Sequence, residues 1–344
     1  MKKVVIGMSG GVDSSVAAYL LKKEGYEVIG VTLLLCDNGE KDIEFAKGVC
    51  ESLGIEHIVL DRKEVFKNTI INSFVDIYEQ GGTPNPCVLC NMAIKFEEML
   101  KFADEIGADY VATGHYCAVI KNNEGRYFIK RPADISKDQT YMLYKLTQKQ
   151  LSRTLMPLSN YTKEQVREIA LSVGLVSADR PDSQDICFVS DGDYKGFIEN
   201  YTGKKYPEGD FVSVDGKVLG RHKGIIGYTV GQRKGLGIAL GKPAFVISKN
   251  ADLNTVTLSD NEELLYTDTV KIKDINLIPF KSFEGDLQVN AKLRYRHKES
   301  SATLTLTGEN EGVLVFDEKQ RAAAKGQAAV FYCDDILIGG GTIV

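Results

Sequence analysis

Three cysteines lie in surroundings that could support sulfur or redox chemistry. Cys87 and Cys90 form a CxxC pair that follows two closely spaced prolines, and Cys187 stands about a hundred residues later. The thiolate is the reactive form of cysteine, and the amino terminus of a helix stabilises it. We expect Cys90 to begin a helix after the prolines, so its thiol should have a lowered pKa.

A glycine turn near the start of the chain could bind an anion. Residues 4–6 are an apolar run typical of a buried strand, and apolar residues recur at helical spacing from Val16 onward. Between them the chain reads SGGVDSS, which is neither a Walker loop nor a dinucleotide fingerprint. Such a turn presents helix amides and serine hydroxyls, and this predicts a phosphate or pyrophosphate site. The alternative is an ordinary strand–helix turn with an Asp or Ser cap.

The elements that would position these groups alternate between strand and helix over the first 120 residues. Strands are predicted at 26–34, 57–60 and 109–113, and helices at 42–53, 62–78 and 90–106. This alternation implies a parallel sheet with helices on both faces. Ligands of such sheets bind at the carboxyl ends of the strands. The glycine turn, the CxxC pair and the segment at residues 113–116 all lie at or beside such ends.

The pattern changes along the rest of the chain. Residues 125–131 are predicted to be one arm of a hairpin, residues 137–141 to open an aromatic-rich helix, residues 163–173 to be helical, and residues 193–201 to close the first domain. After about residue 203, short alternating segments between Gly, Asn and Asp are typical of small β-barrels. We therefore expect three domains, which comprise residues 1–202, 203–268 and 269–344.

Composition limits the class of protein. The chain has 344 residues, 43% of them hydrophobic and 26% charged, which is typical of a globular protein. Its apolar runs are too short to span a bilayer, and its start has no signal-peptide pattern, so we expect a cytoplasmic protein without a membrane partner. Seven cysteines in a chain of this length do not indicate a disulfide framework. In a reducing compartment they would be free, metal-bound or catalytic.

Charge is distributed unevenly along the chain. The net charge of −5 argues against indiscriminate binding of nucleic acid. Between residues 217 and 249, however, there are seven Lys and Arg residues and no acid. A second basic cluster comprises Lys292, Arg294, Arg296 and Lys298, which we expect to share one face of a strand with Tyr295 beside them. These stretches predict phosphate contacts, although a solvated surface is the usual meaning of a charge run.

Eight motifs occur in a fixed order: SGGVDSS, TPNPCVLCN, ATGHY, SKDQTYML, SQDICF, GYTVGQRKGLG, RYRH and RAAAKGQAAVFY. With them the chain resembles, from residue 1 to residue 344, the tRNA-specific 2-thiouridylase family of the ATP pyrophosphatase superfamily. The resemblance implies an α/β domain with the adenine nucleotide alpha-hydrolase-like PP-loop fold, then a small central β-domain and a carboxyl-terminal β-barrel. It also implies a reaction in which ATP, with Mg²⁺, adenylates the C2 oxygen of the wobble uridine. Sulfur from a cysteine persulfide then replaces that oxygen to form 2-thiouridine.

The resemblance further implies partners and site residues. The partners are tRNAs for Lys, Glu and Gln, together with a cysteine desulfurase or a sulfur-relay protein. Cys90 matches the nucleophile and Cys187 the persulfide carrier. The positions matching the ATP site are Gly7, Met8, Ser9, Gly10, Gly11, Val12, Asp13, Ser14, Leu33 and Gly114. The positions matching the target-base and tRNA contacts are Asn85, Pro86, Cys87, His115, Lys137, Asp138, Gln139, Thr140, Tyr295, Arg296 and Gln327.

One departure from the family pattern leaves the mechanism open. Cys87 stands where the better-known pattern has Asp, so Cys87, Cys90 and Cys187 could also be the ligands of an iron–sulfur cluster that carries sulfide. A zinc site with His115 and a redox pair or disulfide are further alternatives. Asp13 could hold Mg²⁺ or only cap its helix. The other cysteines (Cys36, Cys50, Cys117 and Cys333) are expected to be small buried hydrophobic residues.

Two other functions compete with sulfur transfer. A ligase with the same loop would adenylate another substrate, and it would not need the cysteine motifs. A tRNA-binding module with an inactive loop would not release AMP. Alanine at Cys90 and tRNA-dependent AMP release distinguish these functions from a thiolase.

Overall fold

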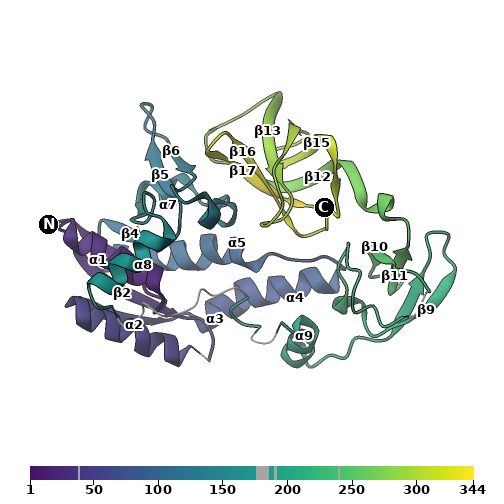
Figure 1. Cartoon of the computed structure of the whole chain (residues 1–344), viewed down its shortest axis with the longest axis horizontal. Helices are drawn as coiled ribbons and strands as arrows, with labels where there is room; N and C mark the ends of the chain where they lie inside the picture. Colours follow the sequence, from purple (N-terminus) through teal and green to yellow (C-terminus); the bar gives the residue numbers. More distant parts are fainter. Residues whose placement is uncertain (38, 176–185, 190–191, 239–240) are drawn as a thin grey trace.

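The structure is a computed structural model that describes residues 1–37, 39–175, 186–189, 192–238 and 241–344. Its amino-terminal part is built on a five-stranded sheet in which every pairing is parallel, as predicted (Figure 1). The strand order is β3-β2-β1-β4-β7. These strands are β1 (Lys3–Gly7), β2 (Glu27–Leu34), β3 (Glu56–Asp61), β4 (Tyr110–Ala112) and β7 (Thr154–Leu155).

Helices cover both faces of this sheet. One face packs against α1 (Val12–Lys23), α2 (Glu40–Leu53) and α8 (Lys163–Ser172). The other packs against a continuous helix made of α5 (Pro86–Cys90), the π-helical turn η2 (Asn91–Phe96) and α6 (Glu97–Glu105). A second long helix comprises α3 (Lys63–Phe66), η1 (Lys67–Ile71) and α4 (Asn72–Glu79).

Two helix predictions are wrong in detail. The helix expected to begin at Cys90 begins at Pro86, because proline fits the first helical position, where no backbone N–H is needed. The aromatic-rich helix expected from residue 137 is replaced by two short 3₁₀ turns, η3 (Ile135–Lys137) and η4 (Thr140–Leu143). The remaining helices of the described part are α7 (Gln148–Ser152) and α9 (Tyr194–Thr202), besides the 3₁₀ turns η5 (Ile225–Gly227) and η6 (Glu262–Leu265).

Two further sheets follow in the chain. The central one has the order β10-β11-β8-β9 and comprises β8 (Gly209–Val212), β9 (Val218–His222), β10 (Phe245–Asn250) and β11 (Thr255–Ser259). The last one closes into a barrel because its first and last strands pair. Its six strands are β12 (Tyr266–Leu277), β13 (Asp286–Lys292), β14 (Ser300–Leu306), β15 (Glu311–Arg321), β16 (Ala328–Cys333) and β17 (Ile336–Ile343).

The barrel is joined directly to the amino-terminal part. The predicted hairpin is present as β5 (Ala118–Lys121) and β6 (Tyr127–Lys130), and β6 pairs with β17 of the barrel. One hydrophobic core contains Val5 of the parallel sheet, Phe96 of η2, and Val330 and Leu337 of the barrel. In Figure 1 the barrel lies over the long helices, between the parallel sheet and the central sheet. No helix in the described part of the chain is long and apolar enough to cross a membrane.

Candidate active site and nucleic-acid interface

The glycine turn lies at the carboxyl end of β1 and leads into α1, as predicted. Gly10 has a φ of 72°, a value that glycine adopts without strain, and Gly11 is the residue before the first helical turn. The hydroxyl of Ser14 donates to the carbonyl oxygen of Gly11 at 3.1 Å, and Ser9 Oγ lies 3.3 Å from Ser14 Oγ. The turn is therefore held by its own serines, and the amides at the start of α1 form the anion site that this geometry favours.

Asp13 does not cap α1, and its carboxylate is engaged in contacts with distant segments. The helix begins without a side-chain cap. Instead, the two carboxylate oxygens of Asp13 accept hydrogen bonds from the ammonium of Lys163 at 2.8 and 2.9 Å. The hydroxyl of Tyr116 donates to one of them at 2.8 Å. Two segments far apart in the sequence thus hold the second residue of α1.

Gly114 is required for close packing against the same turn. A Cβ at Gly114 would lie 2.8 Å from the carbonyl carbon of Asp13 and from the backbone nitrogen of Ser14. Any side chain here would push the segment after β4 away from α1. The structure therefore gives the motif ATGHY a role in holding the loop, with Gly114 as the contact point and Tyr116 as the hydrogen-bond donor.

The cysteines of the CxxC pair occupy different environments on α5. Cys90 is the last residue of α5, is 7% exposed, and packs in a core with Phe66 and Phe74. Cys87 is the second residue of α5 and is exposed, as is Cys187. All seven cysteines are free thiols. The expected stretch 183–185 of the motif SQDICF lies outside the described residues.

The expected low pKa of Cys90 is wrong. Burial raises the pKa of Cys90 to about 12, the positive charge of Lys95 opposes this rise, and the neighbouring thiols of Cys187, Cys87 and Cys36 add to it. Cys90 lies one turn inside the helix, where the end of the helix no longer stabilises a thiolate. The surrounding protein also raises the pKa of Cys87 and of Cys187, again against the charge of Lys95.

Lys95 is a functional candidate that the sequence did not reveal. In an α-helix, the fifth residue after Cys90 would point about 140° away from it. The π-helical turn η2 immediately follows Cys90, and its i to i+5 spacing instead brings Lys95 onto the side of Cys90. Lys95 is half-buried and forms no ion pair with any residue that the structure describes. Its positive charge lowers the pKa of the thiols of Cys87, Cys90 and Cys187 and the pKa of His115.

Cys36 is a second candidate that the sequence did not reveal. It follows the carboxyl end of β2 by two residues, where ligands of parallel sheets bind. Burial and the neighbouring thiol of Cys187 raise the pKa of Cys36 to about 11. Of the other three cysteines expected to be buried, Cys50 and Cys117 are buried and Cys333 is exposed.

The cysteines do not form a metal site in this arrangement. Within the described ranges, no group of three or more His, Cys, Asp or Glu side chains is placed to hold a metal ion. The proposed cluster ligands Cys87, Cys90 and Cys187 therefore do not fit an iron–sulfur cluster here. His115, whose Nδ1 lies 2.8 Å from the hydroxyl of Thr113, belongs to no such group among the described residues either.

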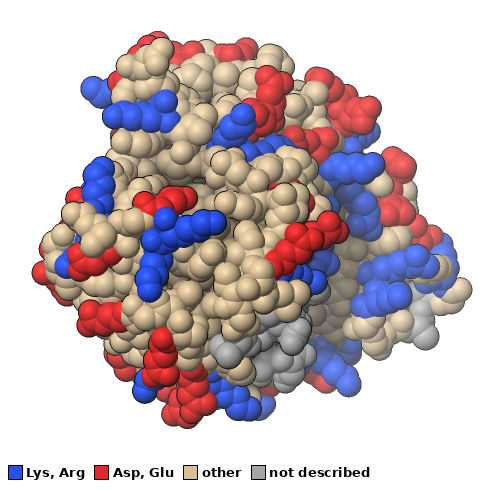
Figure 2. Space-filling model, turned by 60° about the vertical axis from the view of Figure 1, so that its left-hand side comes forward, with Lys and Arg blue, Asp and Glu red and all other residues tan. Residues whose placement is uncertain are grey.

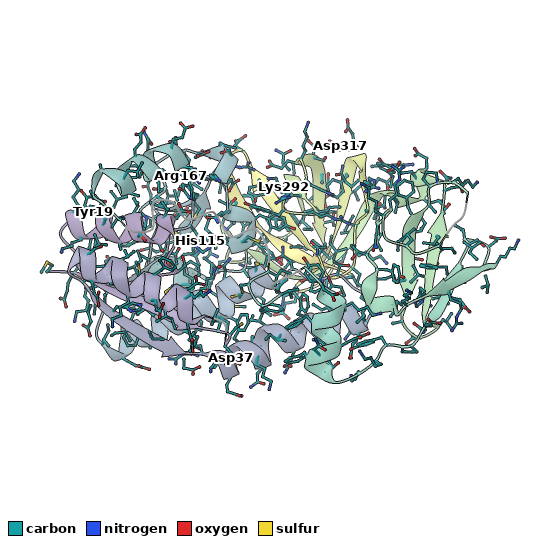
Figure 3. All side chains as sticks on the ribbon, turned by 60° about the horizontal axis from the view of Figure 1, so that its bottom comes forward. Tyr19, Asp37, His115, Arg167, Lys292 and Asp317 are labelled. Atoms are coloured by element: carbon teal, nitrogen blue, oxygen red, sulfur yellow. The ribbon has the colours of Figure 1, made fainter. Side chains whose placement is uncertain are left out.

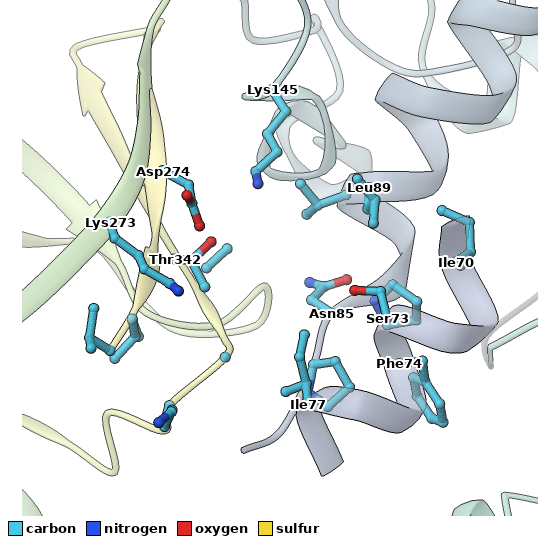
Figure 4. A pocket seen from close by; sticks show the side chains of 18 of the residues that line it. Ile70, Ser73, Phe74, Ile77, Asn85, Leu89, Lys145, Lys273, Asp274 and Thr342 are labelled. Atoms are coloured by element: carbon cyan, nitrogen blue, oxygen red, sulfur yellow. The ribbon is translucent and has the colours of Figure 1, made fainter. Parts of the chain in front are cut away.

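A cavity of about 270 Å³ lies between the long helices and the barrel (Figure 4). Its helix side is mainly apolar and includes Leu89 and Phe74, and Lys145, Lys273 and Asp274 line the opposite side. Asn85 and Pro86 line this cavity, but Cys87 and Cys90 do not. The two cysteines of the motif TPNPCVLC therefore lie outside the cavity, although Val88 and Leu89 of the same helix line it.

Comparison with known proteins decides the family. Residues 2–191 match the model of the tRNA methyl transferase HUP domain, residues 195–260 that of the tRNA methyl transferase PRC-barrel domain, and residues 267–343 that of the aminomethyltransferase beta-barrel domain. A protein of Lachnoclostridium phytofermentans named tRNA-specific 2-thiouridylase MnmA is 50% identical over 357 residues, which cover 100% of both chains. A protein of that name in Clostridioides difficile is 50% identical over 99% of this chain and 98% of its own. The chain belongs to the tRNA-specific 2-thiouridylase family.

The motif SKDQTYML of this 2-thiouridylase family lies at the junction with the barrel. Thr140 is fully buried, and its hydroxyl lies 3.1 Å from the hydroxyl of Tyr332. Gln139 accepts a hydrogen bond from the backbone N–H of Tyr116 at 2.9 Å, and the amide of Gln327 donates to the carbonyl oxygens of residues 83 and 84 at 2.9 and 3.2 Å. These side chains thus connect motifs of the family to one another.

A partly buried arginine anchors this junction. The guanidinium of Arg131 lies 4.3 Å from the ring centre of Tyr332, 3.5 Å from Asp138 Oδ2, and in contact with Glu299. Lys292, which Figure 3 shows on the barrel, also lies 3.5 Å from Glu299. Tyr295 donates to the carbonyl oxygen of Asp138 at 3.1 Å. Asp138 and Tyr295, which come from two different segments expected to contact tRNA, therefore belong to one interaction network.

His115 is neutral at physiological pH. Burial and, to a smaller extent, the charge of Lys95 together lower its pKa to about 3. Its ring stacks on Phe96 with ring centres 6.1 Å apart. Figure 3 shows His115 inside the amino-terminal part. His115 therefore offers an uncharged ring, not a cation for a phosphate.

The two basic stretches are not continuous phosphate-binding surfaces. The ammonium of Lys249 donates to the carbonyl oxygens of residues 82 and 228 at 3.2 and 2.6 Å, and burial lowers its pKa to about 8. The guanidinium of Arg294 donates to the carbonyl oxygens of residues 230 and 322. The predicted phosphate role is therefore wrong for Lys249 and Arg294, and only Lys292 of the second cluster lies on a strand. On the face shown in Figure 2, basic and acidic side chains are intermixed. Tyr295 and Arg296 remain exposed.

Proposed function

We propose that this protein is an ATP-dependent sulfurtransferase that forms 2-thiouridine in tRNA. The observation that carries the proposal is the full-length match, at 50% identity, to proteins named tRNA-specific 2-thiouridylase. The geometry supports it, because an anion-binding turn and a group of mutually influencing thiols both lie at the carboxyl edge of one parallel sheet. Neither a ligase nor a passive binding module would need those thiols.

The first step would activate the uracil. The C2 oxygen attacks the α-phosphorus of ATP, pyrophosphate leaves, and the N3 proton passes to solvent. The turn at Gly10 and Gly11 binds the phosphates through the amides at the start of α1. Asp13, which could hold Mg²⁺, is hydrogen-bonded to Lys163 and Tyr116, and no step here is assigned to a metal ion.

The second step would transfer sulfur by a persulfide relay through Cys187 and Cys90. The terminal sulfur of a persulfide on Cys187 attacks C2, and AMP leaves. The thiolate of Cys90 then attacks the γ-sulfur of Cys187, which releases the thiocarbonyl and leaves a disulfide between the two cysteines. Two thiols are oxidised while the transferred sulfur is reduced, and an external reductant restores the enzyme. Lys95 would stabilise the thiolates, because an opposite charge nearby favours the ionised form.

One experiment tests the proposed function. Unmodified tRNA is incubated with the protein, ATP and a cysteine desulfurase with cysteine, and the digested nucleosides are analysed by mass spectrometry. We expect 2-thiouridine and tRNA-dependent release of AMP from the wild type, and no 2-thiouridine from Cys90→Ala or Cys187→Ala. Formation of 2-thiouridine by Cys90→Ala, or AMP release without any sulfur in the tRNA, would contradict the proposal.

The finer expectations of the resemblance are part of the proposal. The tRNAs would be those for Lys, Glu and Gln, the modified base would be the wobble uridine, and a desulfurase or relay protein would supply the sulfur. The same mass spectrometry with individual purified tRNAs checks the first point. Because the substrate is tRNA, the proposed place of action is the cytoplasm.

A further inference from the structure

Lys163 is a buried lysine that neither the family motifs nor the proposed sulfur chemistry uses. It is the first residue of α8 and is 7% exposed. Its backbone N–H donates to the carboxylate of Asp134 at 3.0 Å, and Thr162 and Gln165 form a capping box around the start of α8. The helix start is therefore fixed, and a lysine placed there reaches the pyrophosphate loop from a rigid base.

The ammonium of Lys163 holds both oxygens of Asp13. A charge in such a site is tolerated only when it is paired. Tyr116, which is 2% exposed, adds a hydroxyl to the same carboxylate. Asp13 is therefore fixed from two sides, by α8 and by the segment that follows β4.

The position of Asp13 gives this ion pair a functional consequence. Asp13 lies in the first turn of α1, beside the amides that would bind the pyrophosphate of ATP. An unpaired carboxylate there would repel the phosphates, since like charges at short range oppose each other strongly where water is partly excluded. Lys163 cancels this negative charge next to the anion site.

We propose that Lys163 is a positioning residue of the nucleotide site, which neutralises Asp13 and holds the first turn of α1 so that the loop can accept the pyrophosphate of ATP. This inference rests on the proposed use of ATP. It assigns to α8, which lies outside the family's loop motif, a direct influence on nucleotide affinity.

The test compares ATP affinities by calorimetry, without tRNA, in the full-length protein. We expect Lys163→Met to weaken ATP binding about tenfold or more, and Lys163→Arg to stay within about threefold of the wild type. The double variant D13N/K163M should regain most of the lost affinity, because it removes the unpaired carboxylate. Arg167→Met is the matched control: Arg167 is an exposed cation one turn farther along α8, labelled in Figure 3, and its loss should leave ATP binding unchanged.

Turnover separates a positioning role from a general loss of structure. In Lys163→Met the KM for ATP should rise at least tenfold, while kcat at saturating ATP and the affinity for tRNA stay within about threefold. Tyr116→Phe is a milder probe, expected to weaken ATP about threefold, and it serves if Lys163→Met does not fold. ATP affinity that is unchanged in both variants, or a double variant no better than Lys163→Met, would overturn the inference. If the wild type forms 2-thiouridine but the variants bind ATP as tightly as the wild type, only this inference is overturned. If the wild type binds no ATP, the proposed function is overturned as well.

Discussion

Replacing Arg131 by Met should destabilise the protein far more than replacing its neighbour Lys130. The side chains of Arg131 and Asp138 are 13% and 8% exposed, so removal of the guanidinium leaves a carboxylate in a mostly buried site. Removing one partner of a buried pair costs about 3–5 kcal/mol. Here Thr140 still donates to Asp138 and Lys292 still faces Glu299, so we expect the lower end, about 3 kcal/mol. For a chain of this size that is a fall in Tm of roughly 4 °C.

Lys130 is the matched control. It pairs with Asp335 at 2.8 Å across the same junction of β6 and β17, but both side chains are almost half exposed. Exposed pairs contribute about 0–1 kcal/mol, so Lys130→Met should lower Tm by roughly 2 °C at most. Circular dichroism is the assay, because the chain has no tryptophan. Arg131→Met should also raise the KM for tRNA, because the network includes Asp138. Equal Tm changes in the two variants would refute the reasoning that burial decides the effect.

Further predictions concern the thiols and their surroundings. Because burial raises the pKa of Cys90 to about 12, its alkylation rate in the free enzyme should rise about tenfold per pH unit from pH 7 to 9 without a plateau; a plateau near pH 8 would contradict this. Lys95→Met should slow that alkylation roughly tenfold, whereas Lys101→Met, on the same helix and paired with Glu98, should not; equal rates in the two variants would exclude the thiolate-stabilising role. Cys87→Ser should retain at least about a third of the 2-thiouridine formation, since the relay does not use Cys87, and loss of all product would reject the relay as written. Because the pKa of His115 is lowered to about 3, its ring is neutral above pH 5, so His115→Gln should leave the pH dependence of tRNA affinity between pH 5.5 and 8 unchanged; a different profile in a filter-binding assay would show that the ring titrates.

Local patterns in the sequence predicted much of the architecture. The apolar run before Gly10, the alternation of strand and helix, and the short alternating segments after residue 203 depend on neighbours within a few positions, and the structure confirms the elements they indicate. The start of the CxxC helix was misplaced because Pro86 was counted as a breaker, although proline is favoured at a first helical position. The direction of the Cys90 pKa shift was wrong mainly because the thiol is buried among distant segments, which local sequence does not show.

Contacts between distant segments could not be predicted from the sequence. The partner of Asp13 is 150 positions away, and the charges of Lys249 and Arg294 are bound to carbonyl oxygens of other elements. The π-helical turn that orients Lys95 has no composition that distinguishes it from an α-helix. Such details depend on tertiary packing, which overrides local preference.

The barrel and the amino-terminal part form one rigid unit. Strand β6 pairs with β17, and both parts contribute to one hydrophobic core. Such an interface does not permit the large relative motions of loosely connected domains. The distance between the nucleotide loop and the barrel is therefore fixed. Under the proposed function, the RNA loop that carries the target uridine must adapt to this distance, so an RNA stiffened at that loop should be a poor substrate even when its sequence is correct.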